Sequence, residues 1–124
     1  MGYALVFVGG GLGAALRHGV NRFAMAAFGP GFPAGTLIVN IVGSLAMGLL
    51  IGALAAVPGG TSQHLRLFLA TGVLGGFTTF SAFSLDALTL WERGQPGTAL
   101  AYVAASVVLS LAAVALGFFA SRAF

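Results

Sequence analysis

Four long apolar stretches, separated by short polar turns, decide what this chain can fold into. They cover residues 3–28, 35–57, 65–91 and 97–121, and each is long enough to cross a bilayer, since a spanning helix needs about 20 residues. Charged residues are only 6% of the chain, too few to cover the surface of a soluble domain. We therefore expect one all-α membrane domain over residues 1–124, with four transmembrane helices, crossing the cell (inner or plasma) membrane several times.

The third apolar stretch is expected to break near its middle, in the run GGFTTFSAFS at residues 75–84. Adjacent glycines weaken a helix, and hydroxyl groups within a hydrophobic segment need partners that lipid does not offer. Non-helical backbone at membrane depth survives only inside protein or along a polar path. It also frees carbonyl and amide groups that can bind ions. The run therefore indicates a permeation site.

Polar side chains recur every fourth residue on the second and fourth stretches, so that each set lies on one helix face. On the second stretch Asn40 is the costly member, because its amide needs a hydrogen-bond partner in hydrocarbon. It either donates to an anion or joins two helices. The fourth stretch carries a stripe of hydroxyl groups that could serve an anion or water: Thr98, Tyr102, Ser106 and Ser110.

Aromatic and basic residues near the break allow two interpretations each. Phe80 and Phe83 are either packing residues or rings whose electropositive edges face an anion path. Arg17 is expected near a membrane interface, either reaching for lipid headgroups or drawing anions into a vestibule.

The titratable residues exclude several classes of protein. His18, His64, Asp86 and Glu92 form no metal-ligand cluster and no nucleophile–base pair, and no carboxylate or histidine falls at the expected midplane for proton coupling. There is no cysteine, and five scattered arginines do not make a nucleic-acid surface. Neutral donors, ring edges and free backbone remain, and such groups can replace the hydration shell of a small anion.

Charge and small residues favour association. Arg66 and Arg122 fall on one side of the membrane, Arg22 and Arg93 on the other, and Arg17 leans toward the second side. This near balance gives either a weak orientation bias or insertion in both orientations, with an antiparallel dimer. Glycine pairs with a spacing of four let helices approach closely and predict a tight bundle: Gly9 with Gly13, and Gly48 with Gly52.

Together these motifs resemble the Fluc family of fluoride channels, also called CrcB proteins. The resemblance covers nearly the whole chain and is carried by GGLGAALR (10–17), GTLIVNIVGS (35–44), TGVLGGFTTFSAFS (71–84) and the Tyr102, Ser106, Ser110 stripe. Two positions differ mildly, with Phe77 where an aliphatic residue is common and Asp86 where glutamate is frequent.

The resemblance implies a dual-topology, antiparallel homodimer with two pores that lets toxic fluoride leave the cell by passive flux. It implies a vestibule at Arg17 and a central sodium ion, structural and not transported, held by the backbone carbonyls of Gly75 and Thr78 from both subunits. The fluoride path would be lined by Asn40, Phe80, Phe83, Tyr102, Ser106 and Ser110.

Two other classes share some of these features. A small four-helix multidrug exporter has the same size and dimeric form, but the first stretch lacks the intramembrane carboxylate that proton coupling needs. A membrane assembly protein without transport activity is the third class. Neither is an enzyme.

Overall fold

Four helical rods make up the protein. The computed structural model describes residues 1–55, 57 and 63–123, and this part of the chain contains no strand. The first two rods are α1 (Gly2–Phe28) and α2 (Ala34–Ala55), and the last is α6 (Pro96–Arg122). The third consists of α3 (Gln63–Arg66), the π-helix η1 (Leu67–Leu74), α4 (Gly75–Phe77) and α5 (Phe80–Glu92). The all-α prediction is confirmed. Of the turn expected at 58–63, only Gln63 is described, and it begins α3.

Turn residues explain where the rods end. Gly29 follows α1 with φ of 78°, and Gly94 follows α5 with φ of 77°. Residues with a side chain rarely adopt a positive φ, so glycine at these two positions lets the backbone turn away at the end of each helix. Pro96 then starts α6, where its missing N–H is not needed.

Three of the rods are long and apolar enough to cross a membrane: α2, the run Gln63–Glu92 and α6. Helix α1 has the length, but Arg17, His18 and its glycines lower its mean hydropathy. The protein is thus a multi-pass membrane protein with a more polar first helix.

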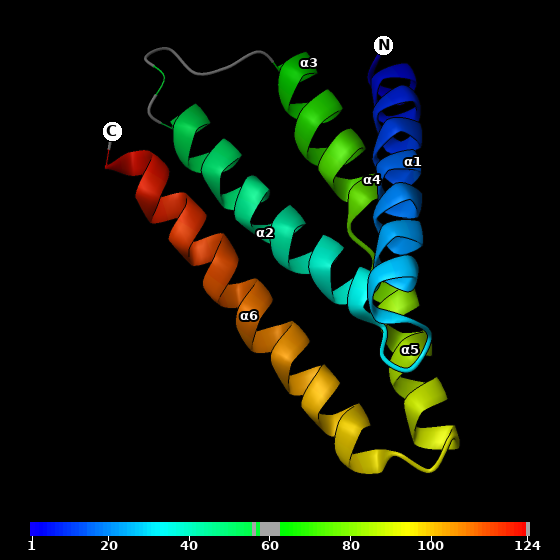
Figure 1. Cartoon of the computed structure of the whole chain (residues 1–124). Helices are drawn as coiled ribbons and strands as arrows, with labels where there is room; N and C mark the ends of the chain where they lie inside the picture. The colour runs from blue at the N-terminus through cyan, green and yellow to red at the C-terminus, as the bar shows by residue number, and fades with distance from the viewer. Residues whose placement is uncertain (56, 58–62, 124) are drawn as a thin grey trace.

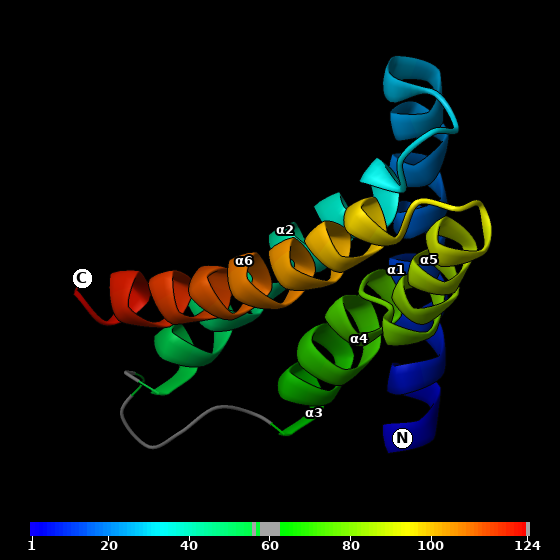
Figure 2. The same ribbon diagram turned by 90° about the horizontal axis from the view of Figure 1, so that it is seen from below.

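The rods pack as two pairs. Helix α1 lies along η1 and α4, while α2 lies along α6 (Figures 1 and 2). The two pairs come together where α5 begins and diverge toward the end that carries both chain termini (Figure 1).

Glycines bring the backbones of each pair into contact. A Cβ atom on Gly9 would lie 2.7 Å from the Phe68 carbonyl oxygen, and one on Gly48 would lie 2.8 Å from the Phe118 nitrogen. Real Cβ atoms do not come so close to backbone atoms. The predicted close approach at the glycine pairs is therefore confirmed.

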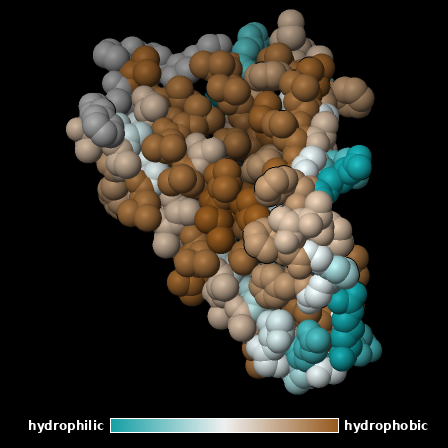
Figure 3. All heavy atoms as spheres, in the orientation of Figure 1, coloured by the Kyte–Doolittle hydropathy of each residue, from teal (hydrophilic) through white to brown (hydrophobic). Residues whose placement is uncertain are grey.

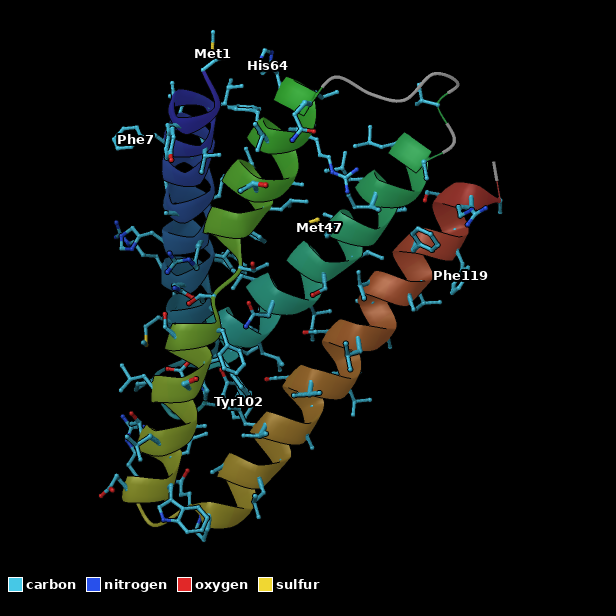
Figure 4. All side chains as sticks on the ribbon, turned by 180° about the vertical axis from the view of Figure 1, so that it is seen from behind. Met1, Phe7, Met47, His64, Tyr102 and Phe119 are labelled. Carbon is cyan, nitrogen blue, oxygen red and sulfur yellow. The ribbon has the colours of Figure 1, made fainter. Side chains whose placement is uncertain are left out.

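One chain buries few large side chains. The small core is formed by Phe83, Leu90, Ala99 and Tyr102 where α5 meets α6. Most apolar side chains point outward, such as Phe7, which is 83% exposed (Figure 4). The face in Figure 3 is largely hydrophobic, with hydrophilic residues gathered mainly where α5 turns into α6. Such a surface needs lipid or another chain to cover it.

Candidate functional site

The break in the third rod lies at Thr78 and Thr79, not at the glycine pair. Gly75 keeps helical angles, with φ of −63° and ψ of −37°. Thr78 and Thr79 are extended, with ψ of 158° and 121°. The predicted break within residues 75–84 is therefore confirmed, and the irregular backbone falls on the two threonines rather than on the glycines.

Packing explains why the glycines stay helical. A Cβ atom on Gly76 would lie 2.9 Å from the Cα of Gly10, so Gly76 lets α4 touch α1. Tertiary contact thus outweighs the low helix propensity of glycine. The glycine pair is a packing feature, and the two threonines that follow it carry the irregular backbone.

A π-helix precedes the break and was not predicted. It spans Leu67–Leu74, and the N–H of Gly75 donates to the carbonyl of Ala70 at its end. π-Helical turns are rare and often lie near functional sites. The hydropathy pattern of this segment does not distinguish a π-helix from an α-helix, so the sequence carries no signal for it.

Asn40 holds the break from α2. Its Oδ1 accepts the Thr79 N–H at 2.8 Å, and its Nδ2 donates to the Thr79 carbonyl at 3.0 Å. The amide thereby replaces the backbone partners that Thr79 lost when it left the helix. Of the two interpretations of Asn40, the contact between helices is present, and one N–H of the amide remains for another acceptor.

Arg17 holds the break from α1. Its Nε donates to the Gly76 carbonyl at 3.1 Å, and the side chain is half-buried. The guanidinium is thus tied to the break through Nε, and the predicted contact with lipid headgroups stays a prediction. The vestibule predicted for it stays a prediction.

Local bonds satisfy part of the remaining backbone. The Leu74 carbonyl accepts both the N–H of Thr78 at 3.1 Å and its Oγ1 at 3.0 Å. The Thr79 side chain caps α5 by accepting the Ala82 N–H at 3.1 Å. Within the described part of the chain, neither the Gly75 nor the Thr78 carbonyl accepts a hydrogen bond. These are the two carbonyls predicted to bind sodium.

The aromatic residues form a continuous series. The ring centroids of Phe80 and Phe83 are 5.4 Å apart, as are those of Phe83 and Tyr102, while Phe32 meets Tyr102 edge-on at 5.5 Å. Phe80 is 75% exposed, whereas Phe83 is 8% exposed. Packing thus accounts for Phe83 within one chain but leaves most of the Phe80 ring uncovered.

Tyr102 is fully buried, and its hydroxyl donates to Asp86 Oδ2 at 3.1 Å. Asp86 was interpreted from the sequence only as a carboxylate near a membrane surface, and its pairing with Tyr102 was missed. Residues 16 apart on separate rods give no periodic signal. Asp86 lines a cavity of about 310 Å³ on the α1 side, together with Asn21 and Thr36.

A larger cleft of about 450 Å³ lies between α2, α6 and the break. Met47, which Figure 4 labels, lines it from α2. Among the described residues, no charged side chain lines the cleft. Of the six residues predicted for a fluoride path, Tyr102 does not line the cleft. The other five do: Asn40, Phe80, Phe83, Ser106 and Ser110.

Two hydroxyl groups in this cleft lack partners. The Oγ atoms of Ser106 and Ser110 are buried and make no hydrogen bond within the described chain. A buried hydroxyl without a partner is costly. A small polar ligand or water that reached these two hydroxyls would supply the missing partners.

Comparison with known proteins gives consistent matches over nearly the whole chain. The family model described as "CrcB-like protein, Camphor Resistance (CrcB)" matches residues 4–118. A protein named Fluoride-specific ion channel FluC from Paracoccus denitrificans (strain Pd 1222) is 63% identical over 117 residues, covering 94% of this chain and 91% of the relative. One of the same name from Rhodopseudomonas palustris (strain BisB5) is 54% identical over 123 residues, covering 99% and 98%.

Proposed function

The chain belongs to the CrcB-like protein family, and from this premise we propose that it is a fluoride-specific ion channel that lets toxic fluoride leave the cell by passive flux. Its relatives bear the name Fluoride-specific ion channel FluC at 54–63% identity over nearly the full chain. The protein is a channel and not an enzyme. The observation that carries the proposal is the uncharged cleft with its two unpartnered serine hydroxyls.

The cleft has suitable chemistry for a small anion. The hydroxyls of Ser106 and Ser110 can donate to fluoride in place of water, and the free N–H of Asn40 adds a third donor. The rings of Phe80 and Phe83 present electropositive edges. Because none of these groups is charged, an anion that enters is desolvated without being trapped, and conduction needs binding that is weak enough to release the ion.

We further propose that two copies form an antiparallel homodimer with one fluoride path for each copy. Support comes from the balance of arginines along the helices. Arg66 and Arg122 end α3 and α6 at the end of the molecule that carries both termini, while Arg22 lies in the last two turns of α1 and Arg93 directly follows α5. The exposed ring of Phe80 and the open cleft also leave surface that a second copy would cover.

Structural sodium is part of the same proposal. The Gly75 and Thr78 carbonyls would hold it, joined by those of the second copy, and two observations fit this assignment. Neither carbonyl accepts a hydrogen bond in the described chain, and Gly75 is exposed on the side away from α1 contacts. Carbonyl oxygens suit a hard cation. Bound sodium would screen the repulsion among these dipoles and thereby strengthen the dimer.

Fluoride efflux from proteoliposomes, followed with a fluoride electrode, tests the function. We expect rapid electrogenic efflux that needs a shunting ionophore and does not need a proton gradient. Substrate-coupled proton movement would favour the exporter class instead, and vesicles without any ion flux would favour an assembly protein. Replacing sodium by N-methylglucamine on both sides should lower the thermal stability of the dimer, and unchanged stability would count against the sodium site.

A further inference from the structure

Side chains from two other helices hold two of the backbone carbonyls at the break. The carbonyls of Gly76 and Thr79 are held by side chains from α1 and α2, whereas those of Gly75 and Thr78 accept no hydrogen bond in the described chain. The side chain that holds Gly76 belongs to Arg17. Arg17 therefore makes a hydrogen bond within the protein, in addition to any attraction that its charge has for anions.

We propose that Arg17 is a positioning residue, which acts through its Nε–H on the Gly76 carbonyl and fixes the end of α4 so that the Gly75 and Thr78 carbonyls stay free for the cation. This inference rests on the proposed channel function and its sodium site. It gives Arg17 a role that depends on its Nε–H group and not on the net charge of the side chain.

Close packing of α1 on α4 makes this bond possible. Gly10 lies against Gly76, and a Cβ atom on Gly13 would lie 2.7 Å from the Phe77 nitrogen. Arg17 follows Gly13 by one helical turn on the same face. Its Nε, near the middle of the side chain, is thus brought to the Gly76 carbonyl.

The bond matters because α4 is only three residues long. The last carbonyls of a helix have no partner within it, and Gly76 would otherwise share this condition with Gly75. Because it occupies the Gly76 carbonyl, Arg17 prevents this oxygen from binding the cation in place of the Gly75 and Thr78 oxygens. It also fixes the direction of the peptide groups on either side.

Two substitutions separate the donor from the charge. In Arg17→Gln, Nε2 is the same number of bonds from Cα as the arginine Nε, so the N–H donor stays and the charge is lost. In Arg17→Lys the charge stays, but a methylene group stands where Nε was. Arg17→Met lacks both. The matched controls are Arg22→Gln and Arg22→Lys, at an exposed arginine five residues further along α1.

The readout is the thermal midpoint of the purified dimer as a function of sodium concentration, with fluoride efflux measured in parallel. We expect Arg17→Gln to keep the sodium concentration for half-maximal stabilisation within about threefold of the unsubstituted protein. Arg17→Lys and Arg17→Met should raise it by about tenfold, as expected for the loss of one hydrogen bond. The Arg22 variants should not change it.

The opposite order, with lysine close to the unsubstituted protein and glutamine impaired, would overturn the proposal in favour of attraction of anions by charge. Equal behaviour of all three Arg17 variants, whether all normal or all unstable, would overturn it as well, because glutamine alone should preserve the bond. Failure of the unsubstituted protein to conduct fluoride would instead overturn the proposed function.

Discussion

Removal of the Asn40 side chain tests how the break is supported. Asn40→Ala deletes both hydrogen bonds to Thr79, at 2.8 Å and 3.0 Å, and leaves an N–H and a carbonyl without protein partners. Each unsatisfied group costs about 1–3 kcal/mol, so the expected loss is about 2–6 kcal/mol in the free energy of unfolding. Asn40→Leu, which fills a similar volume, should lose nearly as much, since the effect comes from hydrogen bonds and not from a cavity.

Ser44→Ala is the matched control. Ser44 lies one turn further along α2, lines the same cleft, and makes no hydrogen bond within the described chain. We expect it to change the free energy of unfolding by less than about 0.5 kcal/mol, as is usual away from special contacts. Unfolding would be followed by titration with sodium dodecyl sulfate in mixed micelles.

Flux measured on the same samples separates the two roles of Asn40. We expect Asn40→Ala and Asn40→Leu to lose fluoride flux per folded dimer as well as stability, since the amide also has one free N–H beside the cleft. A stability equal to that of Ser44→Ala would refute the hydrogen-bond reasoning. Lost stability with normal flux per dimer would refute a role in the fluoride path and leave Asn40 as a purely structural contact.

Three further predictions concern other parts of the molecule. Phe80→Ile should lower flux with little change in stability, whereas Phe83→Ile should lower both, because only Phe83 is buried within one chain; normal flux in both would make the rings packing residues. A single cysteine at the exposed position Gln95 should react with impermeant reagents from both sides of the membrane, and labelling from one side only would exclude the antiparallel dimer. Gly13→Ala should lower the thermal midpoint by separating α1 from α4, while Gly11→Ala, which has open space around it, should be neutral or gain about 1 kcal/mol from helix propensity; equal midpoints would contradict the close packing.

The helices could be predicted because their signals are local. Apolar stretches of spanning length and turns rich in glycine and proline set both ends of α1, α2 and α6, and the last residue of α5, to within a residue or two. Membrane burial reinforces this agreement, since lipid forces each span to satisfy its own backbone. The polar faces of α2 and α6 could also be predicted, because a spacing of four residues is a local signal. Both faces line the same cleft.

The break could be predicted to lie within residues 75–84, but not at which of them. Gly75 and Gly76 are the weakest helix formers in the run, so the sequence favoured a break there. The energy that decides the position comes from elsewhere: Gly76 fits against Gly10, and Thr79 finds a complete substitute for its helical bonds in Asn40. Neither contact can be inferred from the third stretch alone, because each depends on a residue in another helix.

Arg17 and Asn40 show why residue type identifies a functional region better than it identifies a function. For each, contact with an anion was one of two interpretations from the sequence, because a cation and an amide in a membrane protein need a reason to be there. Both donate to backbone carbonyls at the break. This use has a consequence for permeation. A guanidinium bonded to the Gly76 carbonyl stays outside the cleft, whose described lining is uncharged, so an anion in the cleft meets neutral donors only. The bond that fixes the backbone at Gly76 thus also holds the charge of Arg17 outside the cleft. Weak binding by neutral groups is the condition under which a desolvated anion can leave again.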